Sequence, residues 1–195
     1  MNDLKSYARE NHVPIIRDGG LEFLLKTVKE GGYHNILELG TAIGYSAINM
    51  AQISDDIQID TIERNPEMYA QAVQNVKEAN LEGQIHLHFG EIKEFVPTKT
   101  YDFIFVDAAK GQYYNYLNQF IDYLEPKGRM FFDNMAFHGM VEHPELTNNR
   151  NTRQLVKKIK NFRDMVQDDE RFDIILYENV GDGILILNRR MDYEI

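Results

Sequence analysis

The sequence of 195 residues contains no cysteine, no long apolar run and no apolar core at its N-terminus. The absence of cysteine excludes disulfide bonds, thiolate metal sites and catalysis by a cysteine nucleophile. The longest apolar runs fall far short of the roughly 20 residues that a membrane-spanning helix needs, so we expect no membrane partner. Because the first residues, Met1 to Tyr7, also lack the apolar core of a secretory signal, we expect a cytoplasmic location.

Basic residues are in the minority, since the net charge is −10 at pH 7 and the isoelectric point is about 5.0. Taken over the whole chain, this balance argues against a nucleic-acid partner. The bases are unevenly spread, however, because the stretch from Arg150 to Arg163 holds six of them and no acid. Such a stretch is typical of a solvated helix face, and it is also compatible with a local phosphate-binding surface.

Apolar strands and amphipathic helices alternate along most of the chain. The length favours one domain, which we predict to cover residues 1–195. We expect strands at residues 35–39, 57–62, 85–89, 101–106, 129–132, 172–177 and 183–188. Helices are expected at residues 4–11, 18–31 with Asp18 as N-cap, 45–53, from 66 onwards, 92–95, 112–124 and 152–166. This order predicts an α/β, Rossmann-like, doubly wound sheet of seven strands, mostly parallel and closed by a C-terminal antiparallel hairpin.

Four acidic residues end four of the predicted parallel strands. They are Glu38, Glu63, Asp107 and Asp133. In an open parallel sheet, ligands bind outside the carboxyl ends of the strands, so these side chains should meet at one edge. We therefore expect a strongly negative rim that suits a cationic cofactor, a divalent metal ion or both.

The loop from Gly40 to Gly44 follows the first predicted strand. Its two glycines allow a tight turn and a close approach of the backbone to a ligand. Their spacing is Gly-x-x-x-Gly, whereas dinucleotide enzymes carry Gly-x-Gly-x-x-Gly. Glu38 stands just before this loop and would repel a pyrophosphate, which makes a nicotinamide oxidoreductase the weaker alternative. S-adenosylmethionine fits better, because its sulfonium is cationic and it carries no phosphate.

Two further acids are candidates for cofactor binding. Glu63, at the end of the second strand, is placed to accept hydrogen bonds from ribose hydroxyls, although a plain loop carboxylate before Arg64 is the alternative. Gly90 and Glu91, at the end of the third strand, are placed to flank the adenine ring. Gly-Glu after a strand is also common in turns, so this second assignment depends on its context.

Several segments together resemble the metal-dependent O-methyltransferases, the group that includes the catechol and caffeoyl-coenzyme A enzymes. The resemblance covers nearly the whole chain, and within the group it is strongest to the bacterial tRNA 5-hydroxyuridine methyltransferases. The segments that carry it are Val13-Pro-Ile, Glu38-Leu-Gly-Thr-Ala-Ile-Gly-Tyr-Ser, Thr61-Ile-Glu-Arg, Phe105-Val-Asp-Ala-Ala-Lys-Gly-Gln-Tyr and Asp133-Asn134.

The resemblance implies roles for individual residues. Asp107, Asp133 and Asn134 are implied as ligands of Mg²⁺ or another divalent cation such as Mn²⁺. Lys110, together with Asp107, is implied as the catalytic group, with the lysine as the base near the substrate hydroxyl. The residues implied to contact S-adenosylmethionine are Ile16, Glu38, Ser46, Glu63, Glu91, Ile92 and Asp107. A homodimer is also implied.

Elementary chemistry agrees with these roles but leaves alternatives. Carboxylate and amide oxygens are the hard ligands that Mg²⁺ prefers, and a substrate with two adjacent oxygens can complete its coordination. Asp133-Asn134 is also typical of a turn after a strand. The alternative for Lys110 is a solvated lysine before a helix, without a catalytic role. His138 and His143, in the irregular stretch 134–149, are candidates to line a substrate pocket.

Two substrates therefore remain as hypotheses. The first is the wobble uridine of tRNA, converted from 5-hydroxyuridine to 5-methoxyuridine, with the stretch 150–163 holding phosphates. The second is a small catechol-like or caffeoyl-type molecule, which suits the overall acidity of the chain.

Overall fold

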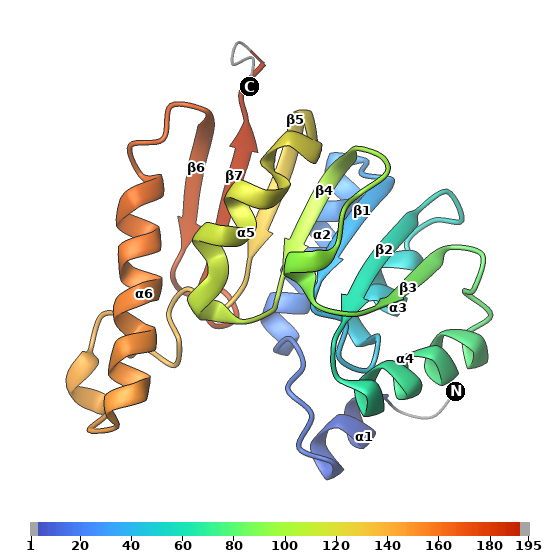
Figure 1. Ribbon diagram of the computed structural model, residues 1–195, viewed down its shortest axis with the longest axis horizontal. Helices are drawn as coiled ribbons and strands as arrows, with labels where there is room; N and C mark the ends of the chain where they lie inside the picture. Colours follow the sequence, from blue (N-terminus) through green and yellow to red (C-terminus); the bar gives the residue numbers. More distant parts are fainter. Residues whose placement is uncertain (1–3, 192–195) are drawn as a thin grey trace.

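The computed structural model describes residues 4–191, so residues 1–3 and 192–195, at the ends of the predicted domain, lie outside this range. Seven strands form one sheet in the order β3-β2-β1-β4-β5-β7-β6 (Figure 1). The strands from β3 to β5 in this order pair in parallel, whereas β7 runs antiparallel to both β5 and β6. The predicted fold class is therefore confirmed. The strands are β1 (Asn35–Leu39), β2 (Gln58–Glu63), β3 (Ile85–Phe89), β4 (Tyr101–Val106), β5 (Leu124–Phe132), β6 (Phe172–Tyr177) and β7 (Ile184–Arg189).

Helices cover both faces of this sheet (Figure 1). The α-helices are α1 (Leu4–Glu10), α2 (Asp18–Gly31), α3 (Tyr45–Ala51), α4 (Pro66–Glu78), α5 (Tyr113–Phe120) and α6 (Arg150–Val166). Four 3-10 turns join them, namely η1 (Ile92–Glu94), η2 (Lys110–Gln112), η3 (Ile121–Tyr123) and η4 (Pro144–Leu146). Helices α2, α3 and α4 pack on one face, and α5 and α6 on the other. Among the described residues, no helix is both long and apolar enough to cross a membrane.

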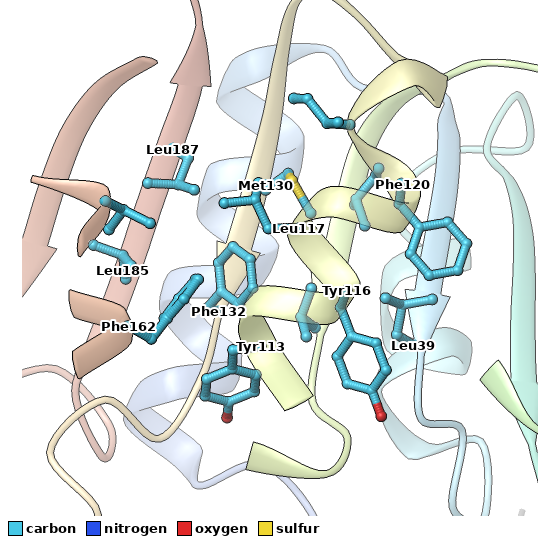
Figure 2. Close-up of a cluster of buried hydrophobic side chains, with 14 of the residues drawn as sticks. Leu39, Tyr113, Tyr116, Leu117, Phe120, Met130, Phe132, Phe162, Leu185 and Leu187 are labelled. Carbon is cyan, nitrogen blue, oxygen red and sulfur yellow. The ribbon is translucent and has the colours of Figure 1, made fainter. Parts of the chain in front are cut away.

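The core forms because the central strands are apolar on both sides. Leu37 and Leu39 of β1 face α5 and α6, while Ile36 faces α2 and α3, as the alternation of side chains along a strand requires. Figure 2 shows the buried cluster between the sheet and helices α5 and α6, in which Phe132 of β5 packs between α5 and Phe162 of α6. With its faces covered in this way, the sheet leaves its carboxyl edge as the place for a ligand.

Several element boundaries differ from the prediction by one to five residues, and three of these differences have a local cause. Arg17, in extended conformation, is the N-cap of α2, and Asp18 is its first helical residue, where its charge suits the helix dipole. Strand β5 begins at Leu124, because Leu124 already pairs with Tyr101 of β4. The register between the two strands then shifts around Pro126 and Lys127, before Arg129 pairs with Phe103. Helix α6 begins at Arg150, because the Asn149 side chain caps it.

Candidate active site

A cavity of about 650 Å³ lies at the carboxyl ends of β1, β2, β4 and β5. It gathers every residue predicted to bind the cofactor or the metal or to act in catalysis except Glu38, although these residues are spread over most of the chain. The predicted residues that line it are Ile16, Gly40, Ser46, Glu63, Glu91, Ile92, Asp107, Lys110, Asp133 and Asn134. Their placement in one cavity is a finding, whereas the individual roles assigned to them stay predictions.

The glycine loop approaches the neighbouring strand end closely. Gly40 has a φ of +101°, and a Cβ at this position would lie 2.4 Å from the carbonyl oxygen of Asp107. Gly44, with a φ of +81°, is the N-cap of α3. Only glycine adopts such a conformation without strain and fits against the β4 backbone. The loop therefore holds Asp107 and the start of α3 against the same cavity.

Glu63 is fixed by backbone amides. One carboxylate oxygen accepts a hydrogen bond from the Ala42 N–H at 2.8 Å, and the other accepts from the Asn65 N–H at 2.8 Å. These contacts orient the carboxylate at the wall of the cavity. The predicted ribose contact is compatible with this position, because a carboxylate oxygen has lone pairs for a second donor.

The segment that carries Glu91 and Ile92 forms another wall. Glu91 lies 3.6 Å from the Arg64 guanidinium. From α5, the Gln119 side-chain amide donates to the carbonyl oxygens of Ile92 at 3.0 Å and Phe95 at 3.1 Å. The wall is therefore fastened to the helix behind it.

Glu38 lies beneath the cavity and does not line it. Its side chain is fully buried, and its carboxylate accepts hydrogen bonds from the Ser46 and Thr61 hydroxyls. Burial raises the pKa of Glu38 to about 8, against the opposing effect of these two hydrogen bonds. Burial therefore favours the neutral acid, and Glu38 does not line the cavity, so the prediction that it contributes a charged acid to the rim is wrong. The argument that its charge repels a pyrophosphate fails with it.

Asp107, Asp133 and Lys110 form the polar end of the cavity. The Lys110 Nζ lies 3.8 Å from Asp107 Oδ1. Burial raises the pKa of Asp107, and the charge of Lys110 opposes this rise. Burial, and after it the negative charge of Asp107, raises the pKa of Asp133 to about 7. Two carboxyl groups that resist simultaneous ionisation are the arrangement that a bound cation stabilises.

The predicted metal ligands have one feature that a metal site would explain. Oδ1 of Asp133 is buried and has no hydrogen-bond partner among residues 4–191, which is costly for a carboxylate oxygen. The next residue, Asn134, has a left-handed backbone conformation with a φ of +62°. Its side-chain N–H donates a hydrogen bond to Asp182 Oδ2, with 3.4 Å between the nitrogen and the oxygen. Within the same part of the chain, no group of three or more His, Cys, Asp or Glu side chains is placed to hold a metal. The predicted set contains two side chains of these types, because its third member, Asn134, is an amide.

Among the polar residues of the cavity that sequence reasoning missed are Asp182 and Arg17. Asp182, from the turn between β6 and β7, is buried, and Arg17 lies 3.5 Å from its carboxylate. The signals were Gly181-Asp-Gly183, which marks a close approach of a turn, and the position of Arg17 next to Ile16. Of the two histidine candidates, His138 lines the cavity, whereas His143 is not among its lining residues and pairs with Glu145.

The basic stretch lies on α6, and five of its six bases are exposed. The sixth, Arg163, has a side chain only 12% exposed and bridges Glu142 at 2.7 Å and Glu178 at 3.3 Å. It holds the irregular segment and the end of β6 against α6. The other five form a solvated face.

Known proteins similar to this chain are methyltransferases. Residues 3–191 match the sequence profile of a family described as O-methyltransferase. The caffeoyl-CoA O-methyltransferase of Medicago sativa is 31% identical over 184 residues, which cover 86% of this chain and 72% of that protein.

Two solved structures extend the likeness to three dimensions. A Staphylococcus aureus protein, provisionally assigned as a caffeoyl-CoA O-methyltransferase, has a TM-score of 0.91 at 35% identity, covering 95% of this chain and 90% of its own. An O-methyltransferase from Bacillus cereus in complex with SAH has a TM-score of 0.79 at 25% identity, covering 95% of this chain and 88% of its own.

Proposed function

The chain belongs to this O-methyltransferase family and is an S-adenosylmethionine-dependent O-methyltransferase of the caffeoyl-CoA type. We propose that its acceptor is a small catechol-like or caffeoyl-type molecule. The observation that carries the proposal is the single cavity in which the predicted cofactor residues meet the Asp107, Asp133 and Lys110 group. A catechol or caffeoyl ring offers two adjacent oxygens to that group.

We also propose that a divalent cation, Mg²⁺ or Mn²⁺, is held by Asp107, Asp133 and Asn134. The unpartnered oxygen of Asp133 supports this proposal, as do the raised pKa values of both aspartates. Oxygen ligands of this kind suit a hard cation. Such a cation, when bound, lowers the pKa of a substrate hydroxyl and fixes the position of a second oxygen beside it.

The side chains of the cavity then carry out the transfer. Only the neutral amine of Lys110 can take the proton of the acceptor hydroxyl at its Nζ, and the positive charge of a cation held by Asp107 and Asp133 would favour that form. Asp107, whose Oδ1 lies 3.8 Å from this Nζ, holds the lysine near the reacting oxygen. That oxygen forms a bond to the methyl carbon of S-adenosylmethionine, the carbon–sulfur bond breaks, and S-adenosylhomocysteine and a methyl ether result. The cavity walls contribute mainly by position, which in well-oriented systems is worth about 7–11 kcal/mol.

The test separates the two halves of the cavity. We expect Asp133→Ala to abolish methylation of a catechol while the affinity for S-adenosylhomocysteine, measured by calorimetry, changes less than about threefold, because Asp133 acts on the acceptor. Asp122→Ala, at an exposed site, is the matched control. An equal loss of activity and cofactor affinity would mean that the metal set is misplaced. Full activity of chelator-stripped enzyme would overturn the proposed cation.

Wobble 5-hydroxyuridine of tRNA is a second candidate acceptor, because its 5-hydroxyl and O4 are also adjacent oxygens. The observation in its favour is the exposed basic face of α6, whose Lys158 passes beside Gly111, next to Lys110. For this acceptor we expect binding of tRNA to weaken steeply with salt, and Lys157→Glu or Lys160→Glu to reduce the slope. Salt-insensitive turnover of free catechols, with no binding of tRNA, would favour the small acceptor.

A further inference from the structure

Asp182 is a buried carboxylate, 4% exposed, that the proposed reaction does not use. Its oxygens meet groups from two distant parts of the chain. Oδ1 accepts from the His138 backbone N–H at 2.7 Å and lies 3.5 Å from Arg17 Nη1. Oδ2 accepts from the Asn134 side-chain amide at 3.4 Å and lies 4.0 Å from His138 Nδ1. Arg17 and His138 also contact each other through their side chains.

The turn that carries Asp182 is docked onto the chain directly after Asn134. The N–H groups of Met135 and Ala136 donate to the carbonyl oxygens of Gly183 at 2.8 Å and Asp182 at 2.7 Å. Gly183 has a φ of +81°, and a Cβ there would lie 2.4 Å from the Ala136 nitrogen, so the close approach requires glycine. The turn also reaches the acidic end of the cavity, because a Cβ at Gly181 would lie 3.9 Å from Asp133 Oδ1.

We propose that Asp182 is a positioning residue of the methyl-transfer site. By accepting from the Asn134 amide nitrogen, it leaves the amide oxygen as the atom available to a cation. By holding His138 and Arg17, it fixes the irregular segment and the segment before α2 at the cavity, which both residues line. The inference rests on the proposed function, because it assigns Asn134 as a ligand. Groups that orient metal ligands in this way commonly change metal affinity when they are replaced.

Asp182→Asn tests the role with little change of volume. The substituted side chain keeps one oxygen for the His138 N–H, but its amide then presents hydrogens to the amide nitrogen of Asn134. We expect the Kd for Mn²⁺, measured by electron paramagnetic resonance on the full chain, to rise by about 10- to 100-fold. The Kd for S-adenosylhomocysteine should stay within about threefold, because none of the residues that Asp182 contacts in these pairs is itself predicted to bind the cofactor. Asp173→Asn, on the same hairpin and 66% exposed, is the matched control.

Two further measurements decide the remaining outcomes. A double-mutant cycle with Asn134→Ala should be non-additive in Mn²⁺ affinity, and additive losses would show that Asp182 does not act through Asn134. In the unmodified protein, hydrogen exchange at the His138 amide should be slowed, because a buried carboxylate accepts it. Exchange of this amide at the rate of a free loop would overturn the inference even if no variant folds. If the unmodified protein binds no Mn²⁺, the proposed cation is wrong, and the exchange rate alone decides whether Asp182 holds the cavity wall.

Discussion

At the scale of single residues, the protonation of Glu38 makes the free energy of unfolding depend on pH. Its pKa is raised by burial to about 8, so the folded state binds a proton that the unfolded chain releases near its ordinary value of 4.5. Because Glu38 holds more protons in the folded state in this interval, its contribution to the free energy of unfolding is fully present below about pH 4.5 and is lost as the pH rises towards 8. The carboxylate and its two hydroxyl donors therefore form a buried cluster that prefers the neutral acid.

We predict that Glu38→Gln flattens this part of the pH profile, because glutamine keeps the shape of the neutral acid and does not titrate. The free energy of unfolding should fall from pH 5 to pH 8.5 by more in the unmodified protein than in the variant. The difference is at most about 4 to 5 kcal/mol, since one pKa unit is worth about 1.4 kcal/mol. Urea unfolding at the two pH values measures it, and Asp56→Asn, at an exposed site, is the control. Parallel profiles would contradict the raised pKa.

Gly40 is the second residue whose replacement has a sharp expected effect. Alanine at this position would place its Cβ 2.4 Å from a backbone oxygen of Asp107 and would hold a φ of +101°. We predict a loss of about 1–3 kcal/mol of stability from the strain alone. We also expect at least a tenfold weaker binding of S-adenosylmethionine, because the loop must move away from β4. Gly83→Ala is the control, since a Cβ at Gly83 meets no atom within 4 Å. Calorimetric titration and thermal melting of both variants make the comparison.

At the scale of elements, α5 is tied to the wall of the cavity by one side chain. Gln119 donates to two carbonyl oxygens of the segment that carries Ile92. We predict that Gln119→Ala raises the Kd for S-adenosylmethionine by about tenfold, as expected for the loss of roughly 1.4 kcal/mol, and leaves kcat at saturating cofactor nearly unchanged. Asn118→Ala, on the exposed side of the same helix, should change neither value. A fall in kcat without a change in Kd would place the effect of Gln119 in the chemical step.

The order of elements and the gathering of site residues could be predicted from the sequence, because both follow from local patterns. Apolar strands ending in Glu63 or Asp107, and glycines at 40 and 44, are signals that short windows contain. The burial of Glu38 could not be predicted, because it depends on hydroxyl groups from β2 and α3. The sequence of β1 alone does not indicate these partners. The role of Asp182 could not be predicted for the same reason, since its partners lie far away in the sequence.

At the scale of the whole molecule, the cavity joins the N-terminal segment, the parallel strands and the closing hairpin, so a ligand there should stabilise the fold as a unit. A ligand at 100 times its Kd adds about 2.7 kcal/mol to the folded state. For a chain of 195 residues, 1 kcal/mol raises the melting temperature by about 2–4 °C. We predict that S-adenosylmethionine at this concentration raises it by about 5–10 °C. NAD at the same concentration should leave it unchanged.

The same measurement on two variants shows which part of the cavity binds the cofactor. Asp133→Ala should keep the full shift with S-adenosylmethionine, because Asp133 is proposed to act on the acceptor through the cation. Gly40→Ala should lose most of the shift, because its loop no longer fits between β1 and the end of β4. If NAD produced the larger shift in the unmodified protein, the cavity would bind a dinucleotide in preference to the methyl donor. A loss of the shift in Asp133→Ala would instead mean that the two ends of the cavity are coupled, and that the division between cofactor and acceptor sides is wrong.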